Sequence, residues 1–211
     1  MNVLLDLDGT LTNPREGIVG CIRHALVQLG ETVPPDNELE RFIGPPLRDA
    51  FRELIGDATE RVEAAVTAYR VRFEATGMYE NQIYAGVPDA LSAMSQRGTR
   101  LFLATSKPRV FAERILKHFG LDGSFIRIYG SELDGTRSNK SELIAHILRD
   151  AGLDRSRTVM VGDRSHDIRG AVDNLVRPVG VLWGYGTRAE LQEAGAKELY
   201  ERPEELAQLV A

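Results

Sequence analysis

The chain has 211 residues, of which 26 are Lys or Arg and 31 are Asp or Glu, so its formal net charge is −5. Hydrophobic residues make up 43% and charged residues 27%, which is ordinary globular usage and excludes a disordered or fibrous protein. The acidic balance argues against a nucleic-acid polymer or an anionic membrane as a partner, because both attract basic surfaces.

Location is also constrained by the sequence. No apolar run approaches the roughly 20 residues that span a bilayer, and the first residues lack the basic start of a signal peptide. The single cysteine, Cys21, cannot form an internal disulfide. We therefore expect a cytoplasmic protein that does not associate with membranes.

The first predicted element is a buried parallel strand at residues 3–8, an apolar run that delivers Asp6 and Asp8 to its carboxyl end. Side chains two residues apart share a face of a strand unless the chain turns between them, and Gly9 permits a sharp turn directly afterwards. Carboxylates this close repel each other, so we expect a cation between or beside them. Acids often end strands, but the residues that follow at 9–12 favour a functional site.

Residues 14–84 are predicted to form an all-helical insertion of about 70 residues, large enough to be a small domain. Apolar stripes at helical spacing cover residues 18–29 and 62–73, a shorter helix is expected at 47–55, and no strand-like run lies between them. The core would then comprise residues 1–13 and 85–211. Because the insertion leaves directly after the first strand, we expect it to lie over the acidic pair.

The remainder alternates between short apolar runs and helical patterns. Strands are predicted at 101–104, 125–129, 158–161 and 179–182, and helices at 108–120 and 140–151. This alternation predicts an α/β fold, a doubly wound parallel-sheet core of Rossmann-like type with helices on both faces. In such sheets the site lies at the carboxyl ends of the strands.

A second acidic group follows the strand at 158–161, where Asp163 and Asp167 are spaced by four residues. With Asp6 they make three carboxylates, which together with main-chain carbonyls form an all-oxygen environment suited to Mg²⁺. The alternative is that one of them caps the helix that starts near Ile168. Capping is compatible with a second role for Asp167, but it does not explain acids at both positions.

Two weaker signals also fall at strand ends. Thr105 and Ser106 follow a strand and could equally be the N-cap of the next helix. Lys140 starts a helix, where the helix dipole disfavours a cation. That unfavourable placement favours a functional reason for Lys140, which would be well placed facing the acids and a phosphate.

In this order and spacing the four signals resemble the haloacid dehalogenase-like hydrolases, over essentially the whole chain and including the helical insertion, which would be the cap domain. The resemblance implies the following roles: Asp6 as nucleophile, Asp8 as general acid/base, Thr105 as phosphoryl ligand, Lys140 as the positive residue, and Asp163 and Asp167 as metal-side acids. The dehalogenases of this superfamily lack the second acid of the first motif, so Asp8 indicates phosphoryl transfer. Residues 42–47, 162–167 and 181–186 look most like the 5′-nucleotidase-like branch, next to the phosphoglycolate phosphatases.

The mechanism implied by the resemblance uses Mg²⁺ held by Asp6, the main-chain carbonyl of Asp8, Asp163, and Asp167 directly or through water. Asp6 would form an aspartyl-phosphate, while Asp8 protonates the leaving group and then activates water. The phosphoryl oxygens would be stabilised by Lys140, Thr105 and the main-chain N–H groups of Leu7 and Ser106. Thr10 would support the loop and orient Asp8.

Selectivity is expected from the helical insertion. Arg48 follows a stiff turn at residues 44–46 and could meet a second anionic group on the substrate, although a solvated arginine is an equal alternative. Lys107 and Arg109 are weaker candidates for the same contact.

The leading hypothesis is a Mg²⁺-dependent phosphatase, a monomer or small homo-oligomer, that acts on a small phosphorylated metabolite such as a nucleoside 5′-monophosphate. The enzymatic alternative is a phosphoglycolate phosphatase. The alternative of another class is a non-catalytic regulatory or binding protein on the same scaffold. Loss of Asp6, Asp8 or Lys140 would mark such a protein, and all three are present.

Overall fold

The computed structural model describes residues 1–210 and divides the chain into two compact units. One unit combines Met1–Asn13 with the chain from Ile83 onward, and the other comprises Pro14–Gln82. We call them the core unit and the helical unit. The sequence placed the return to the core at residue 85, and the division in the structure falls two residues earlier.

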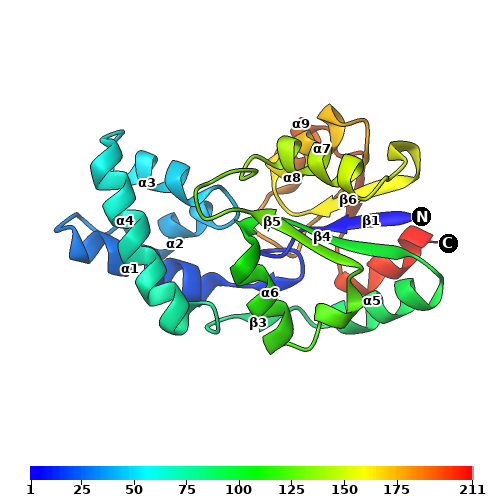
Figure 1. Cartoon of the computed structure of the whole chain (residues 1–211), viewed down its shortest axis with the longest axis horizontal. Helices are drawn as coiled ribbons and strands as arrows, with labels where there is room; N and C mark the ends of the chain where they lie inside the picture. Colours follow the sequence, from blue (N-terminus) through cyan, green and yellow to red (C-terminus); the bar gives the residue numbers. More distant parts are fainter. Residues whose placement is uncertain (211) are drawn as a thin grey trace. The chain divides into compact units, whose positions relative to one another are not determined.

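A six-stranded sheet forms the centre of the core unit (Figure 1). Its strands are β1 (Asn2–Leu5), β4 (Arg100–Pro108), β5 (Arg127–Ser131), β6 (Thr158–Gly162), β7 (Arg177–Val181) and β8 (Glu198–Tyr200). They lie in the order β5-β4-β1-β6-β7-β8, and all neighbouring pairs are parallel. All four residues of the central strand β1 are buried, which is why Val3, Leu4 and Leu5 form a continuous apolar run rather than an alternating pattern; Asn2, at the start of the strand, is the polar exception.

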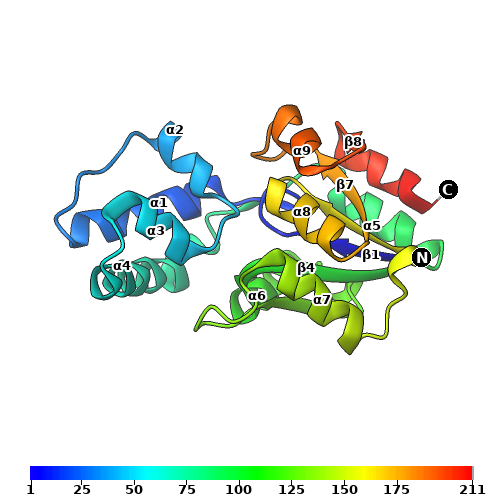
Figure 2. The same ribbon diagram turned by 90° about the horizontal axis from the view of Figure 1, so that it is seen from above.

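Helices cover both faces of the sheet: α5 (Val87–Gln96), α6 (Arg109–His118), α7 (Lys140–Asp150), α8 (Ser165–Asp173) and α9 (Arg188–Ala194). Figure 1 shows α7, α8 and α9 on one side of the sheet and α5 and α6 on the other, and Figure 2 shows α7, α8 and α9 following one another across their face. The chain moves from β1 through β4 to β5, and then from β6 to β8 in the opposite direction. Right-handed crossovers therefore place the helices on opposite faces, and the predicted doubly wound α/β fold is confirmed.

The packing of α7 shows how the helical spacing in the sequence is used. Leu143, Ile144 and Ile147 are fully buried in a cluster with Leu4 and Met160 from the sheet. Burying side chains of this size stabilises the fold by about 2 kcal/mol each. The cluster fixes α7 against the sheet, and with it the position of the first residue of the helix, Lys140.

The helical unit is built from α1 (Arg15–Gln28), α2 (Asp36–Leu39), α3 (Leu47–Ile55) and α4 (Thr59–Arg72), with a short 3₁₀ helix η1 (Glu40–Phe42) and a short π-helix η2 (Phe73–Gly77). Residues 14–81, all of which the structure describes, contain no strand. The helical unit has aromatic contacts in its interior. The ring of Tyr69 lies edge-on to Phe51, with 6.3 Å between the ring centroids, and stacks on Phe73, with 5.4 Å between the ring centroids. The helix α3 has the bounds that its apolar pattern predicted.

The chain passes between the units through two short strands, β2 (Thr12–Asn13) and β3 (Gln82–Ile83), which form a separate two-stranded sheet. Within the core unit, the N–H of Tyr84 donates to the carbonyl of Leu11 at 3.1 Å. The outgoing and returning segments are therefore fixed to each other close to the end of β1, where Asp6 and Asp8 lie.

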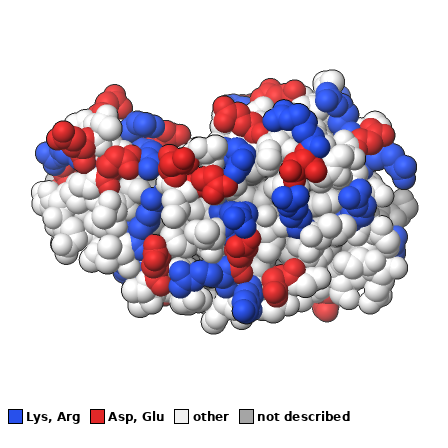
Figure 3. Space-filling model, in the orientation of Figure 1, with Lys and Arg blue, Asp and Glu red and all other residues white. Residues whose placement is uncertain are grey.

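The surface of the protein carries charged side chains of both signs. On the face drawn in Figure 3, basic and acidic side chains are interspersed. Exposed ion pairs such as Arg177–Glu198, with 2.8 Å between Nη2 and Oε2, also join charges of both signs. Across residues 1–210, no helix combines the length and the apolar character that crossing a bilayer requires.

Candidate active site

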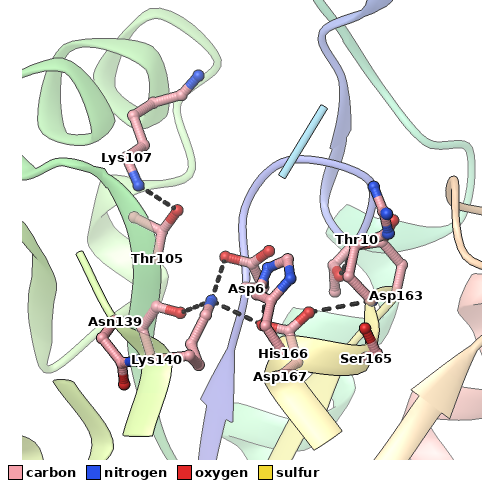
Figure 4. A network of polar contacts seen from close by, with 12 residues as sticks. Asp6, Thr10, Thr105, Lys107, Asn139, Lys140, Asp163, Ser165, His166 and Asp167 are labelled. Carbon is pink, nitrogen blue, oxygen red and sulfur yellow. Dashed lines mark hydrogen bonds and ion pairs between the residues drawn. The ribbon is translucent and has the colours of Figure 1, made fainter. Parts of the chain in front are cut away.

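Three buried carboxylates meet at the carboxyl edge of the sheet (Figure 4). Asp6 directly follows β1, Asp163 directly follows β6, and Asp167 lies in the first turn of α8. Because β1 and β6 pair in register, with Leu5 opposite Val161, their next acidic residues emerge side by side. The N–H of Asp6 also donates to the carbonyl of Val161 at 3.0 Å, which carries the pairing into the site.

The three carboxylates are close and almost inaccessible to solvent. One oxygen atom from each lies within 4.8 Å of the others, and the residues are between 0% and 2% exposed. Burial raises the pKa of Asp6 to about 6 and the pKa of Asp163 well above its usual range, since both charged forms lose water and repel one another. The protein surroundings therefore do not fully compensate the ionised forms of Asp6 and Asp163.

Lys140 is the cation that the acidic pattern predicted, but it joins Asp6 to Asp167 rather than to Asp8. Its Nζ lies 2.9 Å from Oδ1 of Asp6 and 2.7 Å from Oδ1 of Asp167, and it donates to the carbonyl of Ala104 at 2.8 Å. Burial alone lowers the pKa of Lys140, but the charges of Asp167 and Asp6 raise it above the ordinary value overall. This ammonium group is therefore charged at physiological pH.

The helix start that bears Lys140 is stabilised by its neighbour. Oδ1 of Asn139, the N-cap of α7, accepts hydrogen bonds from the N–H groups of Ser141 at 2.9 Å and Glu142 at 3.2 Å. A cation at this end of a helix is opposed by the helix dipole, and the two flanking carboxylates supply the compensation. Lys140 is thus held in place both by its helix cap and by its ion pairs.

Asp167 has the capping role that the sequence allowed, together with an ion pair that the sequence did not specify, and its role as a metal ligand stays a prediction. It pairs with Lys140, and its Oδ2 accepts a hydrogen bond from the N–H of Arg164 at 3.1 Å, which caps α8. The helix begins at Ser165, three residues earlier than the sequence indicated. Burial lowers the pKa of the neighbouring His166 to about 4, so this imidazole is neutral at pH 7 and adds no positive charge to the site.

The loop after β1 is fitted closely around Asp163. Gly9 has φ of +82°, and a Cβ atom there would overlap the Asp163 carboxylate. The hydroxyl of Thr10 donates to Oδ1 of Asp163 at 3.4 Å, and the N–H of Tyr185 donates to Oδ2 at 2.8 Å. The indole N–H of Trp183 donates to the carbonyl of Thr10 at 2.9 Å. The Thr10 side chain therefore supports this loop through Asp163, and not through Asp8 as we had expected.

Thr105 and Ser106 are not a helix N-cap, because β4 continues to Pro108 and α6 begins at Arg109. Thr105 is 2% exposed, and its Oγ1 accepts a hydrogen bond from the N–H of Lys107 at 3.2 Å. The Oγ of Ser106 is buried and has no hydrogen-bond partner within the described part of the chain. Both residues thus belong to the last part of β4, which directly follows Ala104, whose carbonyl accepts a hydrogen bond from Lys140.

Lys107 was a candidate in the sequence for contact with a second anionic group of the substrate, but its pairing with Asp8 was not predicted. Its Nζ lies 2.7 Å from Oδ2 of Asp8, and the two side chains are only 6% and 9% exposed. The sequence did contain a usable signal: Lys107 follows Thr105 by two residues just as Asp8 follows Asp6, and β1 and β4 are paired neighbours. This signal was hidden by the assumption that the strand ends at residue 104.

The other two candidate cations have acidic partners within their own units. Arg48, on α3 of the helical unit, donates to Glu63 through Nε at 2.6 Å and Nη2 at 2.9 Å. Arg109 forms a pair with Glu113 at 2.6 Å along α6. A contact between Arg48 and the substrate stays a prediction.

The donor set suits a divalent cation. Four carboxylates (Asp6, Asp8, Asp163 and Asp167) and two ammonium groups (Lys107 and Lys140) give a local formal charge of −4 + 2 = −2. The atoms that converge are carboxylate oxygens, the ligands that Mg²⁺ prefers. A bound Mg²⁺ ion would offset the negative charge of the neighbouring carboxylates, which adds to the effect of burial in raising the pKa values of Asp6 and Asp163.

Comparison with known proteins agrees with this chemistry. Residues 3–181 match the sequence profile of the family described as haloacid dehalogenase-like hydrolase. A protein of Pseudomonas aeruginosa named 5′-nucleotidase is 50% identical over 191 residues, which cover 90% of this chain and 86% of that protein. A protein of Mycobacterium tuberculosis named tyrosine-protein kinase PtkA is 41% identical over 87% of this chain, and the matched region spans 62% of that longer protein.

Solved structures show the same fold. The crystal structure of a predicted phosphatase from Clostridium acetobutylicum superposes with a TM-score of 0.95 and 38% sequence identity. The superposition covers 99% of this chain and 97% of that one.

Proposed function

The chain belongs to the haloacid dehalogenase-like hydrolases and is a phosphatase of that family; from this premise we propose that it is a Mg²⁺-dependent phosphomonoesterase that acts through an aspartyl-phosphate on Asp6. One observation carries this proposal: the buried ammonium of Lys140 bridges Asp6 and Asp167, with Asp163 completing a compact carboxylate cluster. Burial of three acids and a lysine in this way is costly for stability, so a functional reason is favoured.

The ion would be held by the carboxylates of Asp6, Asp163 and Asp167 and by the main-chain carbonyl of Asp8. When bound, it supplies the positive charge that reduces repulsion between these carboxylates and a phosphate dianion. The protein's contribution is to hold the acids in fixed positions, through Lys140 for Asp6 and Asp167 and through the N–H of Tyr185 for Asp163.

In the first step, a carboxylate oxygen of Asp6 attacks phosphorus and forms a new O–P bond while the bond to the leaving oxygen breaks. With a pKa of about 6, Asp6 is mostly ionised at pH 7 and can act as the nucleophile. The electron pair of the broken bond stays on the leaving oxygen, which takes a proton from the carboxyl group of Asp8. The products are an alcohol and the aspartyl-phosphate.

In the second step, a water oxygen attacks the phosphorus atom of the aspartyl-phosphate and the O–P bond to Asp6 breaks. Asp8, now ionised, takes the proton from that water, so one residue serves as acid and then as base. Inorganic phosphate leaves, and both aspartates return to their starting protonation states.

Positive charge and hydrogen-bond donors surround the phosphoryl position in this proposal. Lys140 contributes an ammonium group, and Thr105 and Ser106 contribute hydroxyl groups, with further donors from the main-chain N–H groups of Leu7 and Ser106. Donors aimed at charge that develops in the transition state contribute up to about 3 kcal/mol each. The unpartnered hydroxyl of Ser106 supports this role, because a buried hydroxyl is normally hydrogen-bonded.

The proposed substrate is a small phosphorylated metabolite, with a nucleoside 5′-monophosphate favoured by the 50% identical relative named 5′-nucleotidase. Phosphoglycolate is the second candidate, since the 5′-nucleotidase-like branch that the sequence resembles lies next to the phosphoglycolate phosphatases. Arg48 of the helical unit would contact a second anionic group on the substrate. A cytoplasmic location and a monomer or small homo-oligomer remain predictions of the sequence.

The test is phosphate release from a panel of p-nitrophenyl phosphate, nucleoside 5′-monophosphates, phosphoglycolate and sugar phosphates, with Mg²⁺ or with a chelator. We expect Mg²⁺-dependent release, and we expect Asp6→Asn to lower kcat/KM by more than about 1000-fold while the variant folds normally. The matched control is Asp89→Asn, the same change at an exposed acid of α5. Turnover by Asp6→Asn at the wild-type rate would refute the covalent mechanism. A wild-type protein inactive on the whole panel would favour the non-catalytic alternative.

A further inference from the structure

The ion pair between Lys107 and Asp8 is a feature of the site that the mechanism above does not use. We infer that Lys107 is a positioning residue: by binding Oδ2 of Asp8 it presents the other carboxyl oxygen, Oδ1, to the leaving group. This inference rests on the proposed function and assigns one further residue to it. The inference concerns the geometry of proton transfer from Asp8 to the leaving group, because the position of the nucleophile Asp6 does not by itself orient Asp8.

The Lys107 main chain is fixed by three contacts from β4 and β5. The N–H of Lys107 donates to Oγ1 of Thr105 at 3.2 Å, and the hydroxyl of Ser131 donates to the carbonyl of Ser106 at 2.9 Å. Gly130 of β5 packs directly against this segment, since a Cβ there would lie 2.6 Å from the carbonyl oxygen of Lys107. The irregular end of β4, where the pairing with β5 shifts between Ala104 and Pro108, is therefore held in one conformation.

The Asp8 main chain is fixed separately. Asp8 forms a β-bridge with Thr12, and the N–H of Gly9 donates to the carbonyl of Thr12 at 2.8 Å, which closes the loop after β1. The remaining freedom of Asp8 is rotation of its side chain. The Lys107 ammonium group restricts that rotation, because it lies 2.7 Å from Oδ2 of Asp8 and each of the two side chains is less than one tenth exposed.

The second oxygen of Asp8 is left available. Its Oδ1 is buried and makes no hydrogen bond with any of residues 1–210, which the structure describes. Buried carboxylate oxygens without hydrogen-bond partners are uncommon in proteins. At a site of proton transfer, such an oxygen can carry the proton that is transferred. Proton donation to the leaving oxygen, and later proton uptake from water, can then both occur at Oδ1 while Oδ2 stays bound to Lys107.

The inference predicts a dependence on the leaving group. A nitrophenolate is stable without a proton, whereas an alkoxide needs one as the P–O bond breaks. Loss of correct Asp8 placement should therefore slow cleavage of alkyl phosphates and spare cleavage of an activated aryl phosphate. If Lys107 instead only bound the phosphate group, its loss would weaken binding of both substrates equally.

The experiment measures the single-turnover rate of leaving-group release with saturating Mg²⁺, because this rate reports P–O cleavage and excludes breakdown of the intermediate. The substrates are an alkyl monophosphate that the wild-type protein hydrolyses and 2,4-dinitrophenyl phosphate. For Lys107→Met we expect about a 100-fold slower release from the alkyl ester, because general-acid catalysis usually contributes at least about this much. For the dinitrophenyl ester, which needs no proton, we expect less than about a threefold change. The KM for each substrate should change by less than about twofold, because Lys107 orients Asp8 and does not bind substrate.

Three further variants complete the test. Lys107→Arg keeps a cationic donor and should recover most of the alkyl-ester rate, and Lys117→Met makes the same deletion at an exposed lysine of α6 and should change neither rate. Equal rate losses for both substrates, or a KM effect alone, would overturn the inference while the proposed function stands. Lys107→Gln serves if the methionine variant does not fold. A wild-type protein with no phosphatase activity would instead overturn the proposed function, and this inference with it.

Discussion

At the scale of single residues, the site is dominated by charges that have almost no access to water. Lys140 and Asp167 are buried together, with side chains 1% and 0% exposed. Removing both charges from water is costly, and their mutual attraction offsets that cost only while the partners stay together. Asp6 is the group under the greatest conflict, because burial and two neighbouring carboxylates raise its pKa while Lys140 lowers it.

A stability prediction follows for Lys140→Met. Without the ammonium group, the pKa of Asp6, already about 6, rises further, and the buried carboxylates lose their compensation. When a carboxyl group has a raised pKa in the folded state, the free energy of unfolding falls as the pH rises through that pKa. The stability lost in Lys140→Met should therefore be larger at pH 8 than at pH 5. We expect about 3–5 kcal/mol of destabilisation at pH 8.

Urea denaturation at both pH values checks this prediction. The control is Lys117→Met, which removes an exposed lysine and should change stability by less than about 0.5 kcal/mol. An equal loss of stability at pH 5 and pH 8 would contradict the assignment of the effect to uncompensated carboxylates.

At the scale of elements, each strand end has a local device that fixes a functional side chain. The turn after β1 depends on Gly9, whose φ of +82° lets the chain pass against Asp163. The end of β4 depends on Ser131 and Gly130 of β5, which hold residues 105–108 in extended form. The start of α7 depends on the Asn139 cap, which fixes the residue that reaches Asp6.

Two contributions of Gly9 to stability can be measured separately: its close fit against Asp163 and its left-handed backbone conformation. Gly9→Ala should destabilise the protein for two reasons. The alanine is forced into the left-handed region of backbone conformation, and its Cβ overlaps the Asp163 carboxylate. Gly98→Ala is a matched control, because Gly98 has φ of +76° and no atom within 4 Å of the added Cβ. The backbone penalty in both is about 1–2 kcal/mol.

We expect Gly9→Ala to exceed Gly98→Ala by at least about 1 kcal/mol, the lower end of what overpacking costs. Urea denaturation of both variants gives the comparison. Equal losses would mean that the loop relaxes around the new methyl group, and would remove Gly9 from the residues that hold the site together.

At the scale of the whole molecule, the net charge of −5 does not describe the site. The surface mixes both signs on the face of Figure 3, while the strand ends gather a formal −2 with almost no solvent to screen it. A divalent cation that binds only the folded protein should therefore stabilise the molecule as a whole.

The corresponding measurement is the thermal midpoint Tm with and without Mg²⁺, which needs no substrate. At a concentration about 100 times the dissociation constant, binding adds about 2.7 kcal/mol, so the Tm should rise by about 5–10 °C for a chain of this length. Asp163→Asn should lose most of that rise, whereas Asp89→Asn should keep it. No rise in the wild-type protein, or an equal rise in Asp163→Asn, would contradict the proposed metal ligands.

The sequence by itself determined the α/β class, the helical insertion and the strand-end acids. Buried parallel strands must be nearly all apolar and helices must follow a 3.6-residue period, so both patterns can be read without coordinates. It also indicated Lys140, because a cation at a helix start is unfavourable without a reason. The elements it missed are those with weak patterns, such as the three-residue edge strand β8.

The tertiary structure alone decided which charges meet. Lys140 lies 134 residues from Asp6 in the chain, and Lys107 lies 99 residues from Asp8, so no local pattern could assign these partners. The partners follow from the order of the strands, which places the ends of β4, β1 and β6 side by side, and from the extension of β4 to Pro108. Strand order and strand ends are set by packing and by hydrogen bonds between distant segments, and such information is not contained in the composition or periodicity of any one segment.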